Sequence, residues 1–385
     1  MKSRQRRPRS SSTTSQRSRP PTSTPRVQAV YGIDVRLPDM VYAATKQSPT
    51  YGGSFKSFDF ESIRRRPGVI AAVPMEGLGA ASGIAVVADT WWHAKTALDA
   101  MPVTWDQGSN ANGSSSDLFD QYRAALDQRG PTPVDEGDVE VALRGATKII
   151  EAEYHLPRQA HAQMEPPNCT ARVTANRAEV WIGTQTPDYA TLKTAKLTGL
   201  PTDNVFVYNC FEGGGFGRGG MHGELEQAVT VAKALNGRPV KVLWTREEDL
   251  GHVNGYHPMG VAKMTAGLGP DGMPVALWIR VAGNDALEGT PLIEFGKYKA
   301  KLAHQLLRGF HLFPYGVPNL RIEANTMKTF ALHGARPAAT RTFSISKASS
   351  KRWRTPPEKI QSSTGGPSSR VRVPPRSRIT LKRTG

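Results

Sequence analysis

The chain has 385 residues, of which 38% are hydrophobic, enough for two or three domains with their own cores. No segment approaches about 18 consecutive apolar residues and no apolar run follows the basic N-terminus, so neither a membrane span nor a secretory signal peptide is expected. Two cysteines without a Cys-x-x-Cys pair, Cys169 and Cys210, do not support a zinc or iron–sulfur site. We interpret both as small buried hydrophobic residues.

The net charge of +17 is concentrated at the two ends of the chain. Residues 1–26 contain eight Lys and Arg and no acid, and residues 335–385 contain thirteen with one acid, so residues 27–334 carry −3. Both ends are rich in Ser, Arg and Pro and are predicted to be disordered. A nucleic-acid-binding protein with basic arms is one alternative, but the folded part is not basic and does not interleave aromatic with basic residues. We therefore expect no nucleic-acid partner.

Residues 27–106 are predicted to form a small α/β domain. Strands are predicted at 35–44, 67–73, 84–88 and 103–105. Asp89 or Thr90 can cap a helix that runs to about Ala100, and Pro102 stops it. Strands that alternate with a helix indicate helices packed on a sheet.

Residues 107–146 are predicted to be a polar linker with a helix at 117–127, and residues 147–334 a second folded region. The strands predicted in this region are 147–154, 169–173, 178–183, 205–210 and 240–244, and the helices are 188–198 and 223–235. Asp271-Gly272 predicts a hairpin between 261–269 and 275–282. The fold class expected from this order is α+β, with mixed sheets and packed helices.

The motif with the strongest chemical implication is Glu-Gly-Gly-Gly-Phe-Gly-Arg-Gly-Gly at 212–220, between a predicted strand and a predicted helix. Glycines let backbone N–H groups approach a ligand closely, and consecutive amides can hold an oxyanion or a metal oxo group. The motif is neither a Walker loop nor a dinucleotide-binding Gly-x-Gly-x-x-Gly. Taken alone, it is equally compatible with a structural turn.

Three further segments accompany this glycine loop, in a fixed order: His-Ala-Gln-Met-Glu-Pro-Pro-Asn-Cys-Thr-Ala at 161–171, Trp-Ile-Gly-Thr-Gln-Thr-Pro at 181–187, and residues 238–249. Together they resemble the molybdopterin-binding large subunits of the xanthine dehydrogenase and aldehyde oxidase superfamily, in particular the bacterial isoquinoline 1-oxidoreductase beta type. The resemblance extends from about Val27 to Leu332. It implies that 27–106 is an a/b hammerhead-like domain and that 147–334 is the first molybdopterin-binding domain, in incomplete form.

The resemblance implies cofactor-binding roles for six residues. Gln185 matches the family's pocket glutamine, whose amide hydrogen-bonds an oxygen ligand of molybdenum. The loop that lies against the metal centre is matched by Gly214, Gly215, Phe216 and Gly217. Arg218 stands where bacterial relatives usually have an arginine. A second arginine often follows it there, but this chain has Gly219, so the resemblance gives less support for a contact between Arg218 and the pterin phosphate. We interpret Glu165 as bracing the loop. No protein-ligated metal is assigned.

The activity that the resemblance implies is hydroxylation of an aldehyde or an N-heterocyclic aromatic, with oxygen from water. The cofactor would be molybdenum in a molybdopterin, usually the cytosine dinucleotide in bacteria. Electrons would pass to a small [2Fe–2S] iron–sulfur subunit, since this chain lacks the cysteines for such clusters. The expected location is the cytoplasm, or the periplasm if an export signal has been lost.

The resemblance fades after Leu332, and the family's catalytic glutamate lies farther along a longer chain, so no catalytic residue is assigned. A shifted reading frame joins the third base of each codon to the first two bases of the next codon. Codons for Ala339–Ser369 can be chosen so that this shifted frame encodes an amphipathic helix followed by a Gly-Lys-Asp-Pro turn. We therefore hypothesise that 335–385 is read out of frame, and we expect a truncated chain that is inactive alone. A non-catalytic folded remnant is the alternative.

Overall fold

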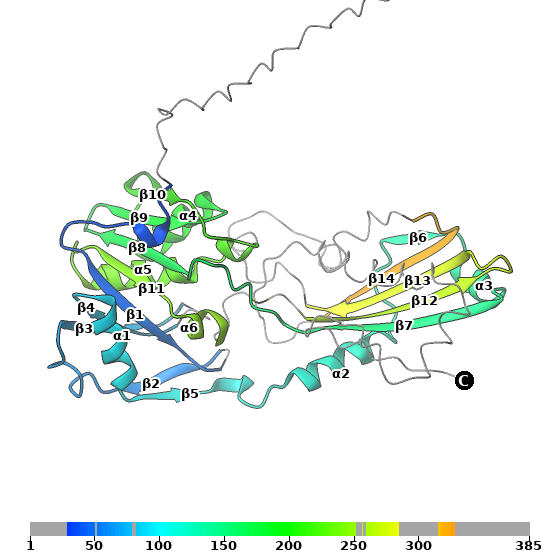
Figure 1. Ribbon diagram of the computed structural model, residues 1–385, viewed down its shortest axis with the longest axis horizontal. Coiled ribbons are helices and arrows are strands. Elements are labelled where there is room, and N and C mark those ends of the chain that lie inside the picture. Colours follow the sequence, from blue (N-terminus) through cyan, green and yellow to red (C-terminus); the bar gives the residue numbers. More distant parts are fainter. Residues whose placement is uncertain are drawn as a thin grey trace, which may run out of the picture.

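The computed structural model describes residues 29–50, 52–78, 82–251, 256, 259–284 and 315–327. These residues form two lobes, one built on a seven-stranded sheet and the other on a five-stranded sheet (Figure 1). The ends that we predicted to be disordered, 1–26 and 335–385, lie outside the described residues. No helix among the residues described has the length and apolar character needed to cross a membrane.

The seven-stranded sheet has the order β10-β9-β8-β11-β1-β4-β3. Its strands are β1 (Val41–Gln47), β3 (Val69–Met75), β4 (Gly83–Ala88), β8 (Asn168–Val173), β9 (Ala178–Gly183), β10 (Val205–Cys210) and β11 (Val240–Leu243). The pairs β1–β11 and β9–β10 are parallel, and the other neighbours are antiparallel.

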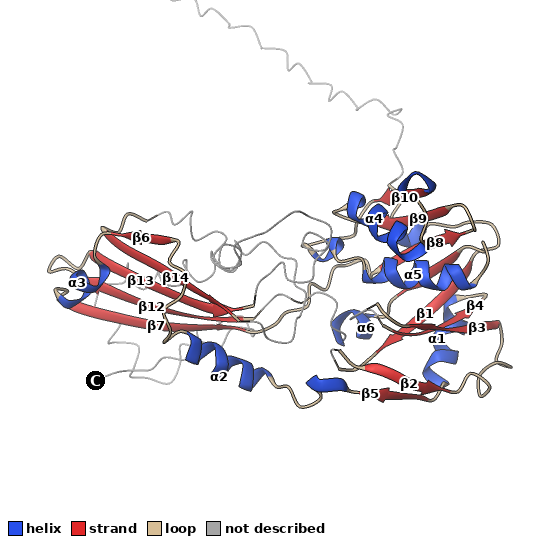
Figure 2. Cartoon of the chain, turned by 180° about the vertical axis from the view of Figure 1, so that it is seen from behind, coloured by secondary structure: helices blue, strands red, loops and turns tan. Residues whose placement is uncertain are grey.

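Helices cover both faces of this sheet (Figure 2). Alternate residues of β4 enter different cores: Ala85 and Val87 pack with α5 (Gly223–Ala234), whereas Ile84 and Val86 pack with α1 (Trp91–Ala100). Helix α4 (Pro187–Thr198) lies beside α5 and contributes Ala190 to the same core. The near-continuous apolar sequence of β4 follows from its burial on both faces.

The five-stranded sheet has the order β6-β14-β13-β12-β7. Its strands are β6 (Val134–Glu136), β7 (Lys148–Leu156), β12 (Gly260–Leu268), β13 (Pro274–Gly283) and β14 (Asn319–Thr326). The helices α2 (Ser115–Ala125) and α3 (Val139–Arg144) pack against it. A separate two-stranded sheet pairs β2 (Ser54–Phe58) with β5 (Val103–Asp106). The remaining elements include η1 (Gly32–Asp34), η3 (Gly108–Asn110), η4 (Thr202–Asn204), η5 (Arg218–Gly220) and α6 (Arg246–Gly251).

The predicted α+β class is confirmed, and the predicted helices are present within a few residues of their expected bounds. The α1 cap is Thr90, whose Oγ1 accepts a hydrogen bond from the His93 N–H at 3.2 Å. The strand predicted at 35–44 starts only at Val41, because the preceding residues form a turn in which Asp39 has a φ of 56°. The Asp271-Gly272 hairpin is confirmed between β12 and β13.

Three differences concern the domain organisation. The seven-stranded sheet combines strands from 27–106 with strands from 147–334. The predicted linker 107–146 contains the expected helix, α2, and in addition α3 and the edge strand β6. Strands β2 and β14 were not predicted. The domain boundaries themselves stay a prediction. Cys169 is buried as expected, whereas Cys210 is only half-buried.

Candidate functional site

The glycine loop and the segment that contains Gln185 leave the sheet at the same edge. β9 and β10 are parallel and in register through Gly183 and Cys210, so the chain that follows each strand emerges on the same side. The Thr184 N–H donates to the Asn209 Oδ1 at 3.1 Å and ties the end of β9 to β10. This strand pairing brings together two segments that are about 30 residues apart in sequence.

The glycine loop has a backbone that few residue types can adopt. Gly214 and Gly217 have φ angles of 103° and 89°, and Phe216 has a φ of 50°. Such a positive φ is unusual for a residue with a bulky side chain and indicates local strain, which is commonly found at ligand sites. The ring of Phe216 folds back over Gly214, where a Cβ would lie 3.1 Å from Phe216 Cε2. Phe216 nevertheless remains 51% exposed, so it borders the site.

Gln185 is joined to this loop by two hydrogen bonds. Its backbone N–H donates to the Gly219 carbonyl at 3.1 Å, and its Oε1 accepts from the Gly217 N–H at 2.9 Å. The Gly217 donor fixes which end of the amide faces the loop. The Gln185 Nε2 has no hydrogen bond within the described part of the chain and, on an exposed residue, it is available to donate outward.

The loop also presents backbone donors. The N–H groups of Gly214, Gly215 and Phe216 have no acceptor among the residues described, whereas that of Gly217 is bonded to Gln185. A Cβ on Gly215 would lie 2.9 Å from Gln185 Oε1 and 2.8 Å from Glu212 Oε2, so a side chain there would have to displace the Gln185 carboxamide and the Glu212 carboxylate. Three consecutive amides beside a carboxamide donor form an arrangement that suits an anion or an oxo group. The residues present therefore fit an oxygen-rich cofactor centre.

The side chain of Arg218 points into the protein interior, toward Glu224. The Arg218 side chain is 1% exposed, Nη2 pairs with Glu224 Oε2 at 3.2 Å, and the guanidinium lies 5.2 Å from the Trp244 ring centroid. Such a buried guanidinium needs its carboxylate partner, because desolvation of an unpaired charge is costly. The structure thus separates Arg218 from the outward donors of Gln185. Its predicted contact with the cofactor stays a prediction.

Glu165 braces the glycine loop, as the sequence indicated. Its Oε1 accepts from the Ile33 N–H at 3.0 Å and from Asn168 Nδ2 at 2.9 Å, and its Oε2 accepts from the Gly213 N–H at 2.8 Å. One carboxylate therefore links η1, the segment before β8 and the loop. A second hydrogen bond holds the segment before β8 against α6, because Arg246 Nη2 donates to the Gln163 carbonyl at 2.7 Å.

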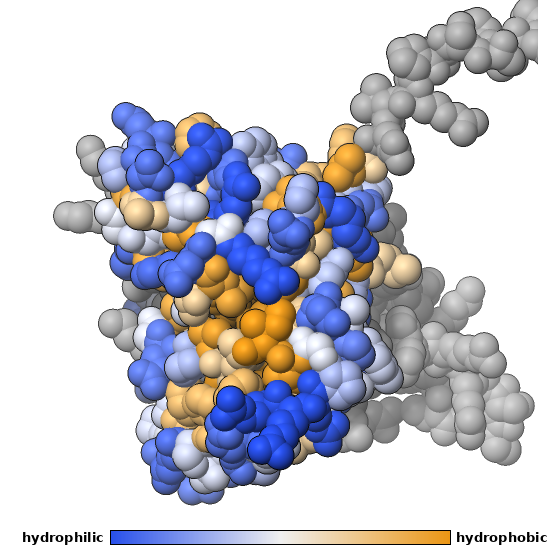
Figure 3. All heavy atoms as spheres, turned by 90° about the vertical axis from the view of Figure 1, so that its left-hand side faces the viewer, coloured by the Kyte–Doolittle hydropathy of each residue, from blue (hydrophilic) through white to orange (hydrophobic). Residues whose placement is uncertain are grey.

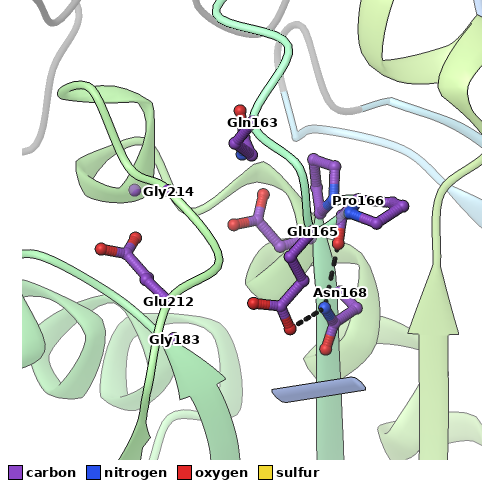
Figure 4. A pocket seen from close by; sticks show the side chains of 10 residues that line it. Gln163, Glu165, Pro166, Asn168, Gly183, Glu212 and Gly214 are labelled. Carbon is purple, nitrogen blue, oxygen red and sulfur yellow. Dashed lines mark hydrogen bonds between the residues drawn. The ribbon is translucent and has the colours of Figure 1, made fainter. Parts of the chain in front are cut away.

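A small polar recess lies beneath the loop, and one of its acidic residues is Glu212, which begins the glycine motif but was given no role from the sequence (Figure 4). The recess has a volume of about 20 Å³, which is space for one water-sized group. Burial and the nearby Glu224 and Glu165 raise the pKa of Glu212, and Arg218 opposes that rise. No group of three or more His, Cys, Asp or Glu among the described residues is arranged to hold a metal ion.

His222 was also missed. It is fully buried with a φ of 63°, and its Nε2 lies 2.9 Å from Thr184 Oγ1 and 3.1 Å from Thr186 Oγ1. Thr184 Oγ1 also donates to the Gly219 carbonyl at 2.7 Å. This network fixes the segment around Gln185 to η5. The sequence signal was weak, namely two threonines flanking Gln185 and a histidine just before α5.

Comparison with known proteins assigns the family. The model for the molybdopterin cofactor-binding domain matches residues 125–343, more than half of the chain. The chain therefore belongs to this family of molybdopterin-dependent oxidoreductases, the family of xanthine dehydrogenase and aldehyde oxidoreductase. The family predicted from the four sequence segments is thus confirmed.

Two curated relatives and one solved structure illustrate the similarity. The isoquinoline 1-oxidoreductase subunit beta of Brevundimonas diminuta is 28% identical over 78% of this chain and 38% of its own length. The membrane-bound aldehyde dehydrogenase [pyrroloquinoline-quinone] of Gluconacetobacter polyoxogenes is 28% identical over 58% and 29%. The aldehyde oxidoreductase of Desulfovibrio gigas has the same fold, with a TM-score of 0.64 at 17% identity over 86% of this chain and 41% of that one.

The chain thus spans well under half the length of the relatives that it matches. Several relatives are named as subunits, among them the molybdenum-binding subunit of an Escherichia coli aldehyde oxidoreductase.

Proposed function

We propose that this chain is part of the large subunit of a molybdenum hydroxylase that oxidises an aldehyde or an N-heterocyclic aromatic, with water as the source of the inserted oxygen. The observation that carries the proposal is the pairing of Gln185 with the glycine loop, which presents outward N–H donors within the matched family domain. The names of the relatives include both an aldehyde-oxidising and an isoquinoline-oxidising enzyme, which supports these two substrate classes.

When bound, a molybdopterin centre would supply the two-electron oxidation. The residues of this chain would position it. The Gln185 Nε2 and the amides of Gly214, Gly215 and Phe216 would donate to its oxygen atoms, because these groups have no acceptor within the described residues. Phe216 would exclude water from one side, since its ring is half-exposed beside the loop. Glu165 would hold the loop in place through the Gly213 N–H.

The finer assignments follow from the same proposal. We propose the cytosine dinucleotide form of the cofactor, a separate [2Fe–2S] subunit as the electron acceptor, and the cytoplasm as the location. The low cysteine content of the chain supports a partner that carries the clusters.

The proposal is tested by measuring how much molybdenum cofactor the chain binds. The chain is expressed in a host that makes molybdopterin, and molybdenum and pterin per chain are measured after purification. Gly215→Ala places a Cβ 2.9 Å from Gln185 Oε1, whereas Gly316→Ala meets nothing within 4 Å and serves as the matched control. We expect molybdenum in the unmodified chain and the control, and about tenfold less in Gly215→Ala, as for other changes beside metal centres. Equal molybdenum in all three, or none in any, contradicts the proposal.

A further inference from the structure

A second cavity lies at the opposite end of the seven-stranded sheet from the glycine loop. The glycine loop and Gln185 follow the ends of β10 and β9, whereas segments of this cavity precede β1 and β11. Strands β1 and β11 are parallel, and β9 runs in the same direction because both β9 and β11 are antiparallel to β8. The cavity is lined by Leu37, Pro38, Asp39, Arg172, Trp181, Asn236, Gly237, Arg238 and Pro239.

The size of this cavity suits a small molecule. Its volume is about 470 Å³, and ligand sites are commonly roughly 300–1,000 Å³. In Figure 1 the turn before β1 lies at the left-hand end of the lobe, and Figure 3 views the molecule from that side. The residues that line the cavity include apolar ones, such as Leu37 and Trp181, and polar ones, such as Arg172. Space of this kind with mixed chemistry favours an amphipathic ligand.

One wall of the cavity is flat and aromatic. The indole of Trp181 stacks on Tyr208 with ring centroids 4.8 Å apart and an interplanar angle of 15°. Tyr208 is held in turn by its hydroxyl, which donates to Glu179 Oε1 at 3.4 Å. A ring held on one face by another ring offers its remaining surface to a planar ligand.

Two guanidinium groups line the same cavity, and each is held by part of its hydrogen-bonding edge. Arg172 binds Glu179 through Nε at 2.7 Å and through Nη2. Arg238 donates from Nε to the Asp39 carbonyl at 3.0 Å. Arg172 Nη1 and both terminal nitrogens of Arg238 have no hydrogen bond within the described part of the chain. Pre-positioned guanidinium N–H groups are suited to carboxylates and phosphates.

The charges around the cavity leave an excess of positive charge. Glu179 is shared by Arg172 and by Arg177, whose Nη2 lies 3.1 Å from Glu179 Oε1. Asp39, which also lines the cavity, adds one carboxylate. With Arg238 included, the lining residues and the ion pairs next to them carry three guanidinium groups and two carboxylates.

The backbone around the cavity is held in unusual conformations. Asp39 and Asn236 have φ angles of 56° and 49°, and Gly237 has a φ of 89°. Left-handed residues other than glycine are uncommon, and two of them on separate loops meet at this one cavity. The fold therefore maintains a specific shape where β1 and β11 begin.

From these features we infer that the cavity is a binding site for a planar aromatic anion, with the ligand ring on the Trp181 indole and its anionic group at the free N–H groups of Arg172 and Arg238. The anionic group can be a carboxylate, as in an aromatic acid, or a phosphate, as in a nucleotide. This site is separate from the glycine loop and does not depend on a bound molybdopterin, so it stands or falls independently of the proposed function.

The test is isothermal titration calorimetry on the full chain with four probes. 2-Naphthoate and adenosine monophosphate represent the two sources of an aromatic anion. 2-Naphthalenemethanol lacks the anion, and inorganic phosphate lacks the ring. We expect saturable binding of at least one aromatic anion and about tenfold weaker binding of both controls, since ring and charge each contribute. Which of the two anions binds distinguishes an aromatic acid from a nucleotide.

Variants locate the binding on the protein. Arg238→Gln removes an exposed guanidinium whose Nε contact is with a turn, so we expect retained folding and about tenfold weaker binding. Arg64→Gln removes an exposed arginine that pairs with Glu61 away from the cavity and is the matched control. Trp181→Leu should also weaken binding, and thermal unfolding monitors its fold. Any one of three results would overturn the inference: no saturable binding of either aromatic anion, equally tight binding of the neutral alcohol, or unchanged binding by the Arg238→Gln variant.

Discussion

The Gln185 Oε1 accepts a hydrogen bond from the Gly217 N–H at 2.9 Å, although the two residues follow different strands of the sheet. This bond orients the carboxamide, so that its oxygen faces the loop and its two N–H donors face away. The same bond stabilises the left-handed conformation of Gly217. Structure of the loop and presentation of the donors are therefore coupled through one side chain.

Two substitutions of Gln185 separate these two roles. Gln185→Glu keeps an acceptor for Gly217 but removes the outward donors, so we expect a nearly unchanged unfolding free energy and loss of bound molybdenum. Gln185→Ala removes both, and should also cost about 0.5–1.5 kcal/mol of stability, the usual net value of one hydrogen bond. Urea unfolding and metal analysis on the same preparations check this. Full molybdenum retention by Gln185→Glu would contradict the donor role.

Gly219 and Glu212 should be coupled in stability. A Cβ on Gly219 would lie 1.7 Å from Glu212 Oε1, so Gly219→Ala must displace that carboxylate. We expect Gly219→Ala to destabilise the fold by about 1–2 kcal/mol, and to cost much less in a Glu212→Ala background. Gly251→Ala, where nothing lies within 4 Å, is the control. Additive effects in the double-mutant cycle would show that the carboxylate does not fill this space.

Glu165 should contribute strongly to stability because three donors converge on it. Glu165→Ala leaves the amides of Ile33 and Gly213 without their acceptor, and we expect a loss of about 3 kcal/mol or more. Glu165→Gln retains one acceptor oxygen and should lose less. The exposed Glu61, whose side chain is 72% exposed, provides the control Glu61→Ala, with a change within about 0.5 kcal/mol. Equal losses for Glu165→Ala and Glu61→Ala would refute the bracing role.

Lys241 should make stability depend on pH. Its Nζ donates to the carbonyls of Ile33 and Val35, both at 2.6 Å. Burial, and next the charge of Arg36, lower its pKa from 10.5 to about 8. Between these two values the unfolded chain binds more protons than the folded chain, so this group raises the unfolding free energy as pH rises from about 8 to 10.5.

The predicted gain is of the order of 3 kcal/mol across that window, at about 1.4 kcal/mol per pKa unit. Below pH 8 the group adds no further slope, because the lysine is then charged in both states. The Lys241→Met variant should lack this rise of the unfolding free energy with pH, whatever its absolute stability. Urea unfolding of both proteins at several pH values checks this, and parallel pH profiles would show that Lys241 is not the group responsible.

Much of the fold could be predicted because its patterns are local. The hydrophobic face of α5, the Thr90 cap of α1 and the Asp271-Gly272 turn each depend on residues close in sequence. Strand β2 was missed because only Phe55 and Phe58 are partly buried, and a register shift between them breaks the alternation that marks a strand in sequence. Strand β14 was missed although several of its residues are buried. Its register with β13 depends on a partner that lies far away in the sequence.

The site could be predicted only as far as its backbone motif. The glycine loop and Gln185 could be assigned because they stand in sequence segments that resemble those of the family, whereas the glycine loop alone is equally compatible with a structural turn. The recess could not be predicted, since Glu212 and Gln163 meet only when the segment before β8 crosses beneath the loop. Equally, an arginine in a glycine-rich motif suggests an outward anion contact, and only the fold shows that Arg218 turns inward toward Glu224.

The insertion of β1 beside β11 also has a consequence for the order of assembly. Val41 pairs with Val240, so the centre of the seven-stranded sheet closes only after some two hundred intervening residues are available. Contacts this distant in sequence form slowly, and during synthesis the edge of β1 that faces β11 stays unpaired until β11 is available, whereas β4 already lies between β1 and β3. The face of β4 that packs on α5, formed by Ala85 and Val87, is likewise uncovered until α5 has been made. Chaperone dependence of expression should therefore track the emergence of β11 from the ribosome.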